Sequence, residues 1–114
     1  MKEDRTVTRL SKLRTVEFMP GIFRTTMSYN ENSMLCHFRL TRGASIKLHH
    51  HAAVQNGYVI KGKVRFLKEG GKSFIVGNGD GYIFGSNEPH GSEVLEDTEL
   101  IECFTPMRPE YVDE

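Results

Sequence analysis

The sequence predicts an all-β protein of sandwich or barrel type. Its apolar residues fall in short segments with the composition of β-strands, and no long segment has apolar residues at helical spacing. Glycine, asparagine and proline separate these segments. Many short strands between frequent turns are typical of two packed sheets or of a closed barrel.

The candidate strands follow one another along most of the chain. They span residues 15–18, 22–28, 34–41, 45–51, 55–61, 63–69, 72–76, 81–84, 91–95 and 99–104. The turn residues at 19–21, 70–71, 78–81 and 86–89 separate them, and the glycine pair at 70–71 marks a hairpin. Asn56-Gly57 also has the composition of a hairpin turn, but residues 58–60 continue as a strand, so we favour a turn at Gly62.

The length of the chain fits one compact domain. Its 114 residues, 38% of them hydrophobic, are enough for one core and too few for two. Residues 1–14 are expected to form a loose N-terminal arm and residues 15–114 the single domain. An arm of this kind often pairs with the sheet edge of a partner, which predicts a homodimer.

The net charge is zero but unevenly distributed. Residues 1–14 carry +3, residues 15–87 carry +5 and residues 88–114 carry −8. The absence of a basic run or of interleaved aromatic and basic residues argues against nucleic-acid binding. The chain has no apolar run long enough to cross a bilayer, so no membrane partner is expected. The N-terminal segment lacks the apolar stretch of a signal peptide, which predicts a cytoplasmic protein.

The two cysteines show no metal-binding pattern. Cys36 and Cys103 lie in apolar, strand-like stretches and have no ligand spacing to each other or to a histidine. We therefore expect two buried thiols.

Four of the five histidines lie in two short clusters, 49–51 and the segment around His90. On an extended strand His49 and His51 share a face, and His50 points the other way. With His90 and Gln55, four neutral donors could converge on one divalent cation. A solvated, histidine-rich loop is the alternative. A tag remnant is disfavoured because the cluster is internal and flanked by apolar strand residues.

The last candidate strand carries a possible acid-base group. Leu100, Glu102 and Phe104 share one face, opposite Ile101 and Cys103. If this face looks into a barrel, burial would raise the pKa of the Glu102 carboxyl and a nearby cation would lower it. A solvent-facing Glu102 is the alternative, because acidic residues are frequent in this part of the chain.

The spacing of these residues resembles the cupin motifs. Gly43, His49, His51, Gln55 and Gly62 reproduce the spacing of the first motif, although most cupins have Glu where this chain has Gln. Four further residues reproduce the spacing of the second motif, namely Gly79, Gly85, Asn87 and His90. There the usual Pro and second Gly are replaced by Gly85 and Asn87, and the terminal Asn by Val94.

The resemblance covers residues 20–109 and implies a single-domain cupin, a double-stranded β-helix of jelly-roll type. It also implies one divalent transition metal (zinc, nickel, iron, manganese or copper), with His49, His51, Gln55 and His90 as ligands. Because this set is neutral, the charge of the metal would be uncompensated, which favours a small anionic partner. His50 is expected to face away, and His37 to lie on the sheet surface or behind the ligands.

Within the cupins, the chain is similar to the pectin-degradation family, which acts on unsaturated uronates. The likeness rests on residues 49–59, on the stretch 92–97 and on the closing pattern at 102–108. The family usually has Asp where this chain has Glu102. Tyr82 and Phe104 are expected to be cavity or core aromatics.

The likeness implies ring opening of a 4,5-unsaturated uronate to its linear keto form. Glu102 would move the proton, Arg108 would hold the sugar carboxylate and Phe104 would pack against the sugar. A solvated surface arginine is the alternative for Arg108. Two other functions stay open: an iron or copper cupin dioxygenase acting on a small organic substrate, and a non-catalytic metal-binding or sugar-binding module.

Overall fold

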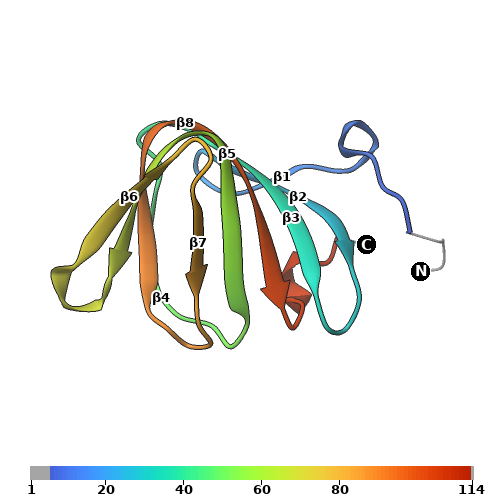
Figure 1. Cartoon of the computed structure of the whole chain (residues 1–114). Helices are drawn as coiled ribbons and strands as arrows, with labels where there is room; N and C mark the ends of the chain where they lie inside the picture. The colour runs from blue at the N-terminus through green and yellow to red at the C-terminus, as the bar shows by residue number, and fades with distance from the viewer. Residues whose placement is uncertain (1–5, 114) are drawn as a thin grey trace.

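The structure, a computed structural model, describes residues 6–113, which fold into one antiparallel sheet that curls over itself (Figure 1). The strands are β1 (Val16–Met19), β2 (Ile22–Tyr29), β3 (Met34–Leu40), β4 (Ser45–His49), β5 (Val54–Lys68), β6 (Ser73–Gly77), β7 (Gly81–Phe84) and β8 (His90–Thr105). Three single-turn 3-10 helices accompany them: η1 (Leu10–Lys12), η2 (Glu69–Gly71) and η3 (Pro109–Tyr111). The predicted all-β class is confirmed.

Two long strands organise the fold. β5 and β8 pair with each other along their whole length, from Val54↔Thr105 to Lys68↔His90. The first half of β8 also pairs with β4, and its second half with β3. Likewise, β5 pairs with β7 near its start and with β6 near its end. The sheet curls over so that its two halves face each other, and each long strand runs through both halves (Figure 1). Segments from all parts of the chain therefore surround one interior.

The predicted turn at Gly62 is wrong, because the strand continues through this residue. Gly62 has a φ of +120° and lies where the β5–β8 register shifts. A side chain here would place its Cβ 2.3 Å from Oγ1 of Thr98. The glycine thus forms a bulge that bends a continuous strand. The predicted strands 55–61 and 63–69 are therefore one strand, β5. The predicted strands 91–95 and 99–104 are also one strand, β8.

The other turns lie where the sequence predicted them. Residues 19–21 close the β1–β2 hairpin, and residues 69–71 close the β5–β6 hairpin. Residues 78–80 join β6 to β7, and residues 85–89 join β7 to β8. Asn56-Gly57 is not a turn but part of β5.

Side-chain alternation along β8 separates the interior from the surface. Leu100, Glu102 and Phe104 are buried, as expected for residues on one face. Cys103, between two of them, is exposed, so the prediction of two buried thiols holds only for Cys36. The apolar neighbours of Cys103 had suggested burial, but its place on the outer face decides its exposure.

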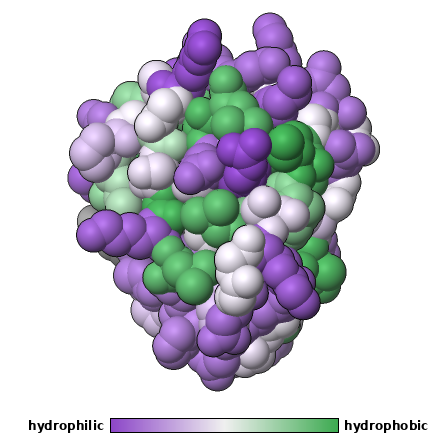
Figure 2. Space-filling model, turned by 90° about the vertical axis from the view of Figure 1, so that its left-hand side faces the viewer, coloured by the Kyte–Doolittle hydropathy of each residue, from purple (hydrophilic) through white to green (hydrophobic). Residues whose placement is uncertain are grey.

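Polar groups lie inside this fold and some apolar groups lie outside. Figure 2 shows apolar side chains among charged ones on the face that carries β6, where Ile75 is 53% exposed. By contrast, the buried residues include Arg24, Gln55, His90 and Glu102. Burial of a polar or charged side chain costs free energy unless the group is hydrogen-bonded or paired. A group of such residues in the interior therefore indicates a candidate functional site.

The described part of the segment before β1, residues 6–15, extends beyond the sheet (Figure 1), and its last residue, Thr15, contacts the hydroxyl group of Thr25 on β2 at 2.6 Å. Within residues 6–113, no helix is long and apolar enough to span a membrane. The division into an arm and a domain, the homodimer and the cytoplasmic location stay predictions.

Candidate metal centre

Three histidines converge at one end of the interior. His49, His51 and His90 each offer a ring nitrogen, and these atoms lie within 4.8 Å of one another. His49 ends β4 and is paired with His90, the first residue of β8. The predicted strand 45–51 is too long, because β4 ends at His49 and His51 lies in the loop before β5. The loop, and not strand alternation, turns His51 toward the other two rings.

Backbone carbonyls fix the protonation pattern of these rings. Each histidine places its Nδ1 within hydrogen-bond distance of a carbonyl oxygen, that of Lys47 (2.9 Å), Ala53 (2.8 Å) or Glu88 (2.8 Å). A carbonyl oxygen only accepts, so each Nδ1 must donate its hydrogen. Each neutral ring then keeps a lone pair on Nε2, which is how metal-binding histidines are usually oriented.

Gln55 supplies a fourth donor atom. Its Oε1 lies 3.0 Å from Nε2 of His51 and 3.2 Å from Nε2 of His90. Its amide nitrogen donates to the Glu102 carboxylate at 2.7 Å, which fixes the orientation of the amide. The amide oxygen and the two nitrogens are all acceptors with no hydrogen between them. Such a set fits a divalent cation. Gln55 is buried, so its amide group lies inside the fold and not on the surface of the strand.

The surroundings keep the rings neutral. Burial lowers the pKa of His90 to about 4. Burial, followed by the nearby Arg108 charge, also lowers the pKa of His51. The His90 ring stacks on Phe84, with 4.4 Å between centroids. Neutral imidazole is the form that binds metal ions, so both rings are ready for one at neutral pH.

A buried carboxyl group lies directly behind Gln55. Glu102 is 7% exposed and accepts hydrogen bonds from Tyr82 Oη at 2.6 Å and from Gln55 Nε2 at 2.7 Å. Burial raises the pKa of Glu102 to about 6, although the Tyr82 hydrogen bond opposes this shift. Burial, followed by the Glu102 charge, raises the pKa of Tyr82, so the phenol stays a donor. Glu102 therefore faces the interior and not the solvent.

The sequence indicates only a cavity or core aromatic at Tyr82, and the contact of Tyr82 with Glu102 becomes evident only in the structure. A signal was present in the alternation of β7, which turns Tyr82 and Phe84 inward, and in the glycine that faces Tyr82 across the β5–β7 pair. That residue is Gly57, and a Cβ there would lie 2.2 Å from Cζ of Tyr82. The glycine leaves room for the tyrosine ring.

We expect Gly57→Ala to destabilise the fold and to displace Tyr82 from Glu102. The added methyl group overlaps the ring, and overpacking of this kind costs about 1–3 kcal/mol. Chemical denaturation of Gly57→Ala beside Gly77→Ala measures the effect, because Gly77 has no positive φ and a Cβ there would come no closer than 3.5 Å to its nearest neighbour. Equal stability of the two variants would contradict an overlap with Tyr82.

Arg108 lines the same cavity as His49, Gln55, His90 and Glu102, and much of the remaining wall is apolar. Its side chain is only 14% exposed. Nη1 donates to Tyr111 Oη at 3.1 Å and Nη2 to Glu110 at 3.0 Å. The buried Nε atom has no hydrogen-bond partner within residues 6–113. An unsatisfied, buried guanidinium nitrogen beside a metal-binding cluster indicates a place for an anionic group.

The remaining predicted residues take different positions. Phe104 is 1% exposed. Its ring packs edge-on against that of His51, with 6.2 Å between the centroids, and its centroid lies 5.3 Å from the guanidinium carbon of Arg108. His50 is exposed and outside the cluster, with Nδ1 3.4 Å from Asn87 Oδ1. His37 is buried and pairs with Glu99 at 2.6 Å, away from the three converging rings.

Sequence comparison places the chain beside two curated proteins. Residues 36–103 match the cupin domain. The pectin degradation protein KdgF of Dickeya dadantii is 32% identical over 98 residues, which cover 84% of this chain and 88% of that protein. The oxalate decarboxylase OxdC of Bacillus subtilis is 39% identical over 72 residues, which cover 60% of this chain. This second match spans only 19% of the decarboxylase.

Two solved structures have the same architecture. KdgF from Halomonas sp. superposes with a TM-score of 0.86 at 26% identity, over 94% of this chain and 98% of that one. An RmlC-like cupin from Shewanella frigidimarina superposes with a TM-score of 0.90 at 21% identity, over 98% and 100% of the two chains. The predicted jelly-roll fold is confirmed.

Proposed function

The chain belongs to the cupin domain family, and we propose that it is a metal-dependent enzyme that opens 4,5-unsaturated uronate sugars to their linear keto form. One observation carries the proposal. A neutral cluster of four metal-binding atoms, three of whose residues line the cavity, lies beside the buried carboxyl group of Glu102 and the guanidinium group of Arg108. The similarity to two KdgF proteins, one of them described as a pectin degradation protein, supports a sugar acid as the substrate.

The charges of the site favour an anionic substrate. His49, His51, Gln55 and His90 would hold the metal, and none of them contributes a negative charge. When bound, the metal would supply Lewis-acid polarisation of substrate oxygens. Arg108 would bind the sugar carboxylate through its guanidinium group, which has an unsatisfied Nε atom. The two positive centres together would select a carboxylate-bearing sugar over a neutral one.

The reaction needs one proton transfer in each direction. As the bond between carbon one and the ring oxygen breaks, the carbon-one hydroxyl loses its proton and an aldehyde forms. The released enol at carbon five becomes a ketone when carbon four gains a proton. Together the two steps are an isomerisation, which needs no oxidant or reductant. Glu102 is assigned to this proton transfer because Tyr82 and Gln55 hold its carboxyl group inside the cavity.

Phe104 is assigned to a supporting role. Because its ring is buried against His51 and Arg108, it has little surface left for a sugar. We propose that it keeps these two side chains in place, so that its effect on substrate is exerted through them.

The proposal predicts that the purified, metal-loaded protein accelerates the loss of the enol absorbance of unsaturated galacturonate or mannuronate. The control is the same protein after treatment with a chelator, which should lose the acceleration and regain it when metal is added back. Equal rates with and without protein contradict the proposal. Uptake of oxygen that depends on a small organic substrate would favour a dioxygenase instead.

A further inference from the structure

The C-terminal segment, residues 109–113, lies beside β2 and β3 (Figure 1). Its central side chain, Tyr111, is buried in the hydrophobic core, where its ring contacts Phe18, Phe38 and Phe104. Tyr111 also lines the cavity that holds the candidate metal ligands. The segment is therefore part of the wall of the site, although it follows the last strand.

Tyr111 contacts Arg108 in two ways. Its hydroxyl oxygen accepts a hydrogen bond from Nη1 of Arg108 at 3.1 Å. Its ring centroid lies 4.4 Å from the guanidinium carbon of Arg108, within the range of a cation–π contact. One tyrosine thus fixes both a nitrogen and the plane of the guanidinium group.

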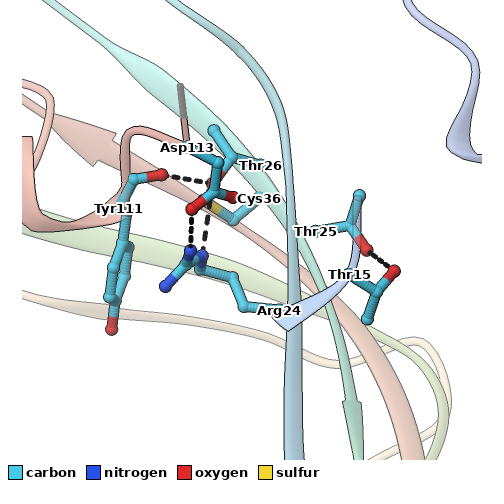
Figure 3. A network of polar contacts seen from close by, with 7 residues as sticks. All are labelled: Thr15, Arg24, Thr25, Thr26, Cys36, Tyr111 and Asp113. Atoms are coloured by element: carbon cyan, nitrogen blue, oxygen red, sulfur yellow. Dashed lines mark hydrogen bonds and ion pairs between the residues drawn. The ribbon is translucent and has the colours of Figure 1, made fainter. Parts of the chain in front are cut away.

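A buried ion pair holds Tyr111 in turn (Figure 3). Arg24, on β2 and 3% exposed, pairs with Asp113 at 2.6 Å. The same arginine donates from Nε to Thr26 Oγ1 at 3.2 Å, and Thr26 donates to the carbonyl oxygen of Tyr111 at 2.6 Å. The Arg24 guanidinium carbon also lies 4.5 Å from the centroid of the Tyr111 ring. The segment is therefore tied to β2 at Tyr111 and again two residues later.

We propose that Tyr111, anchored by Arg24 and Asp113, is a positioning residue that holds Arg108 in the orientation that receives an anionic substrate. In its relation to substrate, the inference rests on the proposed function. The physical reason is entropic, because an arginine side chain has many rotamers and must be ordered before it can bind a carboxylate. Here Tyr111 orders Arg108 in advance, and Arg24 and Thr26 of β2 hold Tyr111 in place.

The first test needs no substrate. In zinc-loaded protein labelled with ¹⁵N-arginine, the Nε–Hε signal of Arg108 is assigned by its loss in Arg108→Lys. We expect it to be as rigid as the backbone in the wild type and mobile in Tyr111→Phe, which keeps the ring but removes the hydroxyl. Asp113→Asn should have the same effect. The matched control is Tyr58→Phe, because Tyr58 is 48% exposed on the outer face of β5. An Arg108 signal that stays rigid in Tyr111→Phe overturns the inference.

The second test links the contact to substrate. Tyr111→Phe should raise KM for unsaturated galacturonate about tenfold, as expected for the loss of a hydrogen bond to a charged group, and leave kcat unchanged. In an Arg108→Lys background the same substitution should have no further effect. A mobile Arg108 with an unchanged KM would overturn the link to substrate binding. If the wild type does not turn over unsaturated uronates, the proposed function fails, and the NMR measurement still decides whether Tyr111 positions Arg108.

Discussion

Replacing His51 with alanine is expected to empty the metal centre and to abolish turnover. The substitution removes one of three converging nitrogens and leaves Gln55 Oε1 without its nearest histidine partner, at 3.0 Å. Loss of a residue that only supports a ligand already weakens metal binding by about 10-fold to 100-fold, so loss of a ligand should weaken it by at least about a hundredfold. Metal analysis of the purified variant and the enol-absorbance assay measure the two effects.

The chain offers a matched control for this experiment. His50 is the neighbouring residue, is exposed and lies outside the cluster, so His50→Ala should keep both the metal and the activity. Together the two variants separate the metal centre from a general effect of histidine loss. A His51→Ala variant with one tightly bound metal ion per chain would contradict the assigned ligand set.

Replacing Glu102 with glutamine is expected to have the second large effect, on chemistry and not on metal binding. The glutamine fills nearly the same space but cannot exchange a proton at neutral pH. We expect kcat to fall by about 100-fold to 10,000-fold, the usual contribution of a general acid or base. The metal content should stay that of the wild type, because Glu102 is not among the converging ligands and the amide oxygen of the new glutamine can still accept the hydrogen bond that orients Gln55.

Two further variants sharpen the Glu102 experiment. Glu96→Gln is the surface control, because Glu96 is exposed and pairs with Lys63 at 3.5 Å. Glu102→Asp restores a carboxyl group and the residue usual in the pectin-degradation family, so it should recover activity that glutamine lacks. Wild-type kcat in Glu102→Gln would remove this residue from the proton transfer.

The spacing of residues in the sequence was enough to predict the candidate ligands, because most of them are close together in the chain. His49, His51 and Gln55 are separated by a few residues around one loop, and His90 begins the strand that pairs with β4. The orientation of these side chains could not be predicted, since it depends on backbone carbonyls and on the contact between Gln55 and Glu102. The carbonyl contacts are local, two residues along the chain, but they depend on the exact path of the loops, and the contact between Gln55 and Glu102 joins two strands that are far apart in the sequence.

The errors in the fold have a common physical origin. Gly62 resembles a turn residue in the sequence, but the close approach of Thr98 from β8 makes it a bulge. Cys103 resembles a buried residue, but its position beside Glu102 puts it on the outer face. For Gly62 the partner strand decides the outcome, and for Cys103 the alternation of side chains along β8 decides it, so local composition is a poor guide in both cases.

The contacts that position Glu102 and Tyr111 could not be predicted from the sequence, because they join residues that are far apart in the chain. Tyr82 and Glu102 come from β7 and β8, and Arg24 and Asp113 are 89 positions apart in the chain. A single sequence does not indicate which distant residues will be in contact. They become visible only when the curled sheet brings its first and last segments around one cavity.

The most direct test of the central claim follows the substrate itself by proton NMR in D₂O. With metal-loaded protein, we expect the vinyl proton signal of the unsaturated uronate to disappear faster than in buffer. The product should be the linear keto acid with one deuterium on a single face of carbon four, because one enclosed carboxyl group delivers it. An unchanged rate, or deuterium shared equally between the two faces, would contradict ring opening and ketonisation by this site.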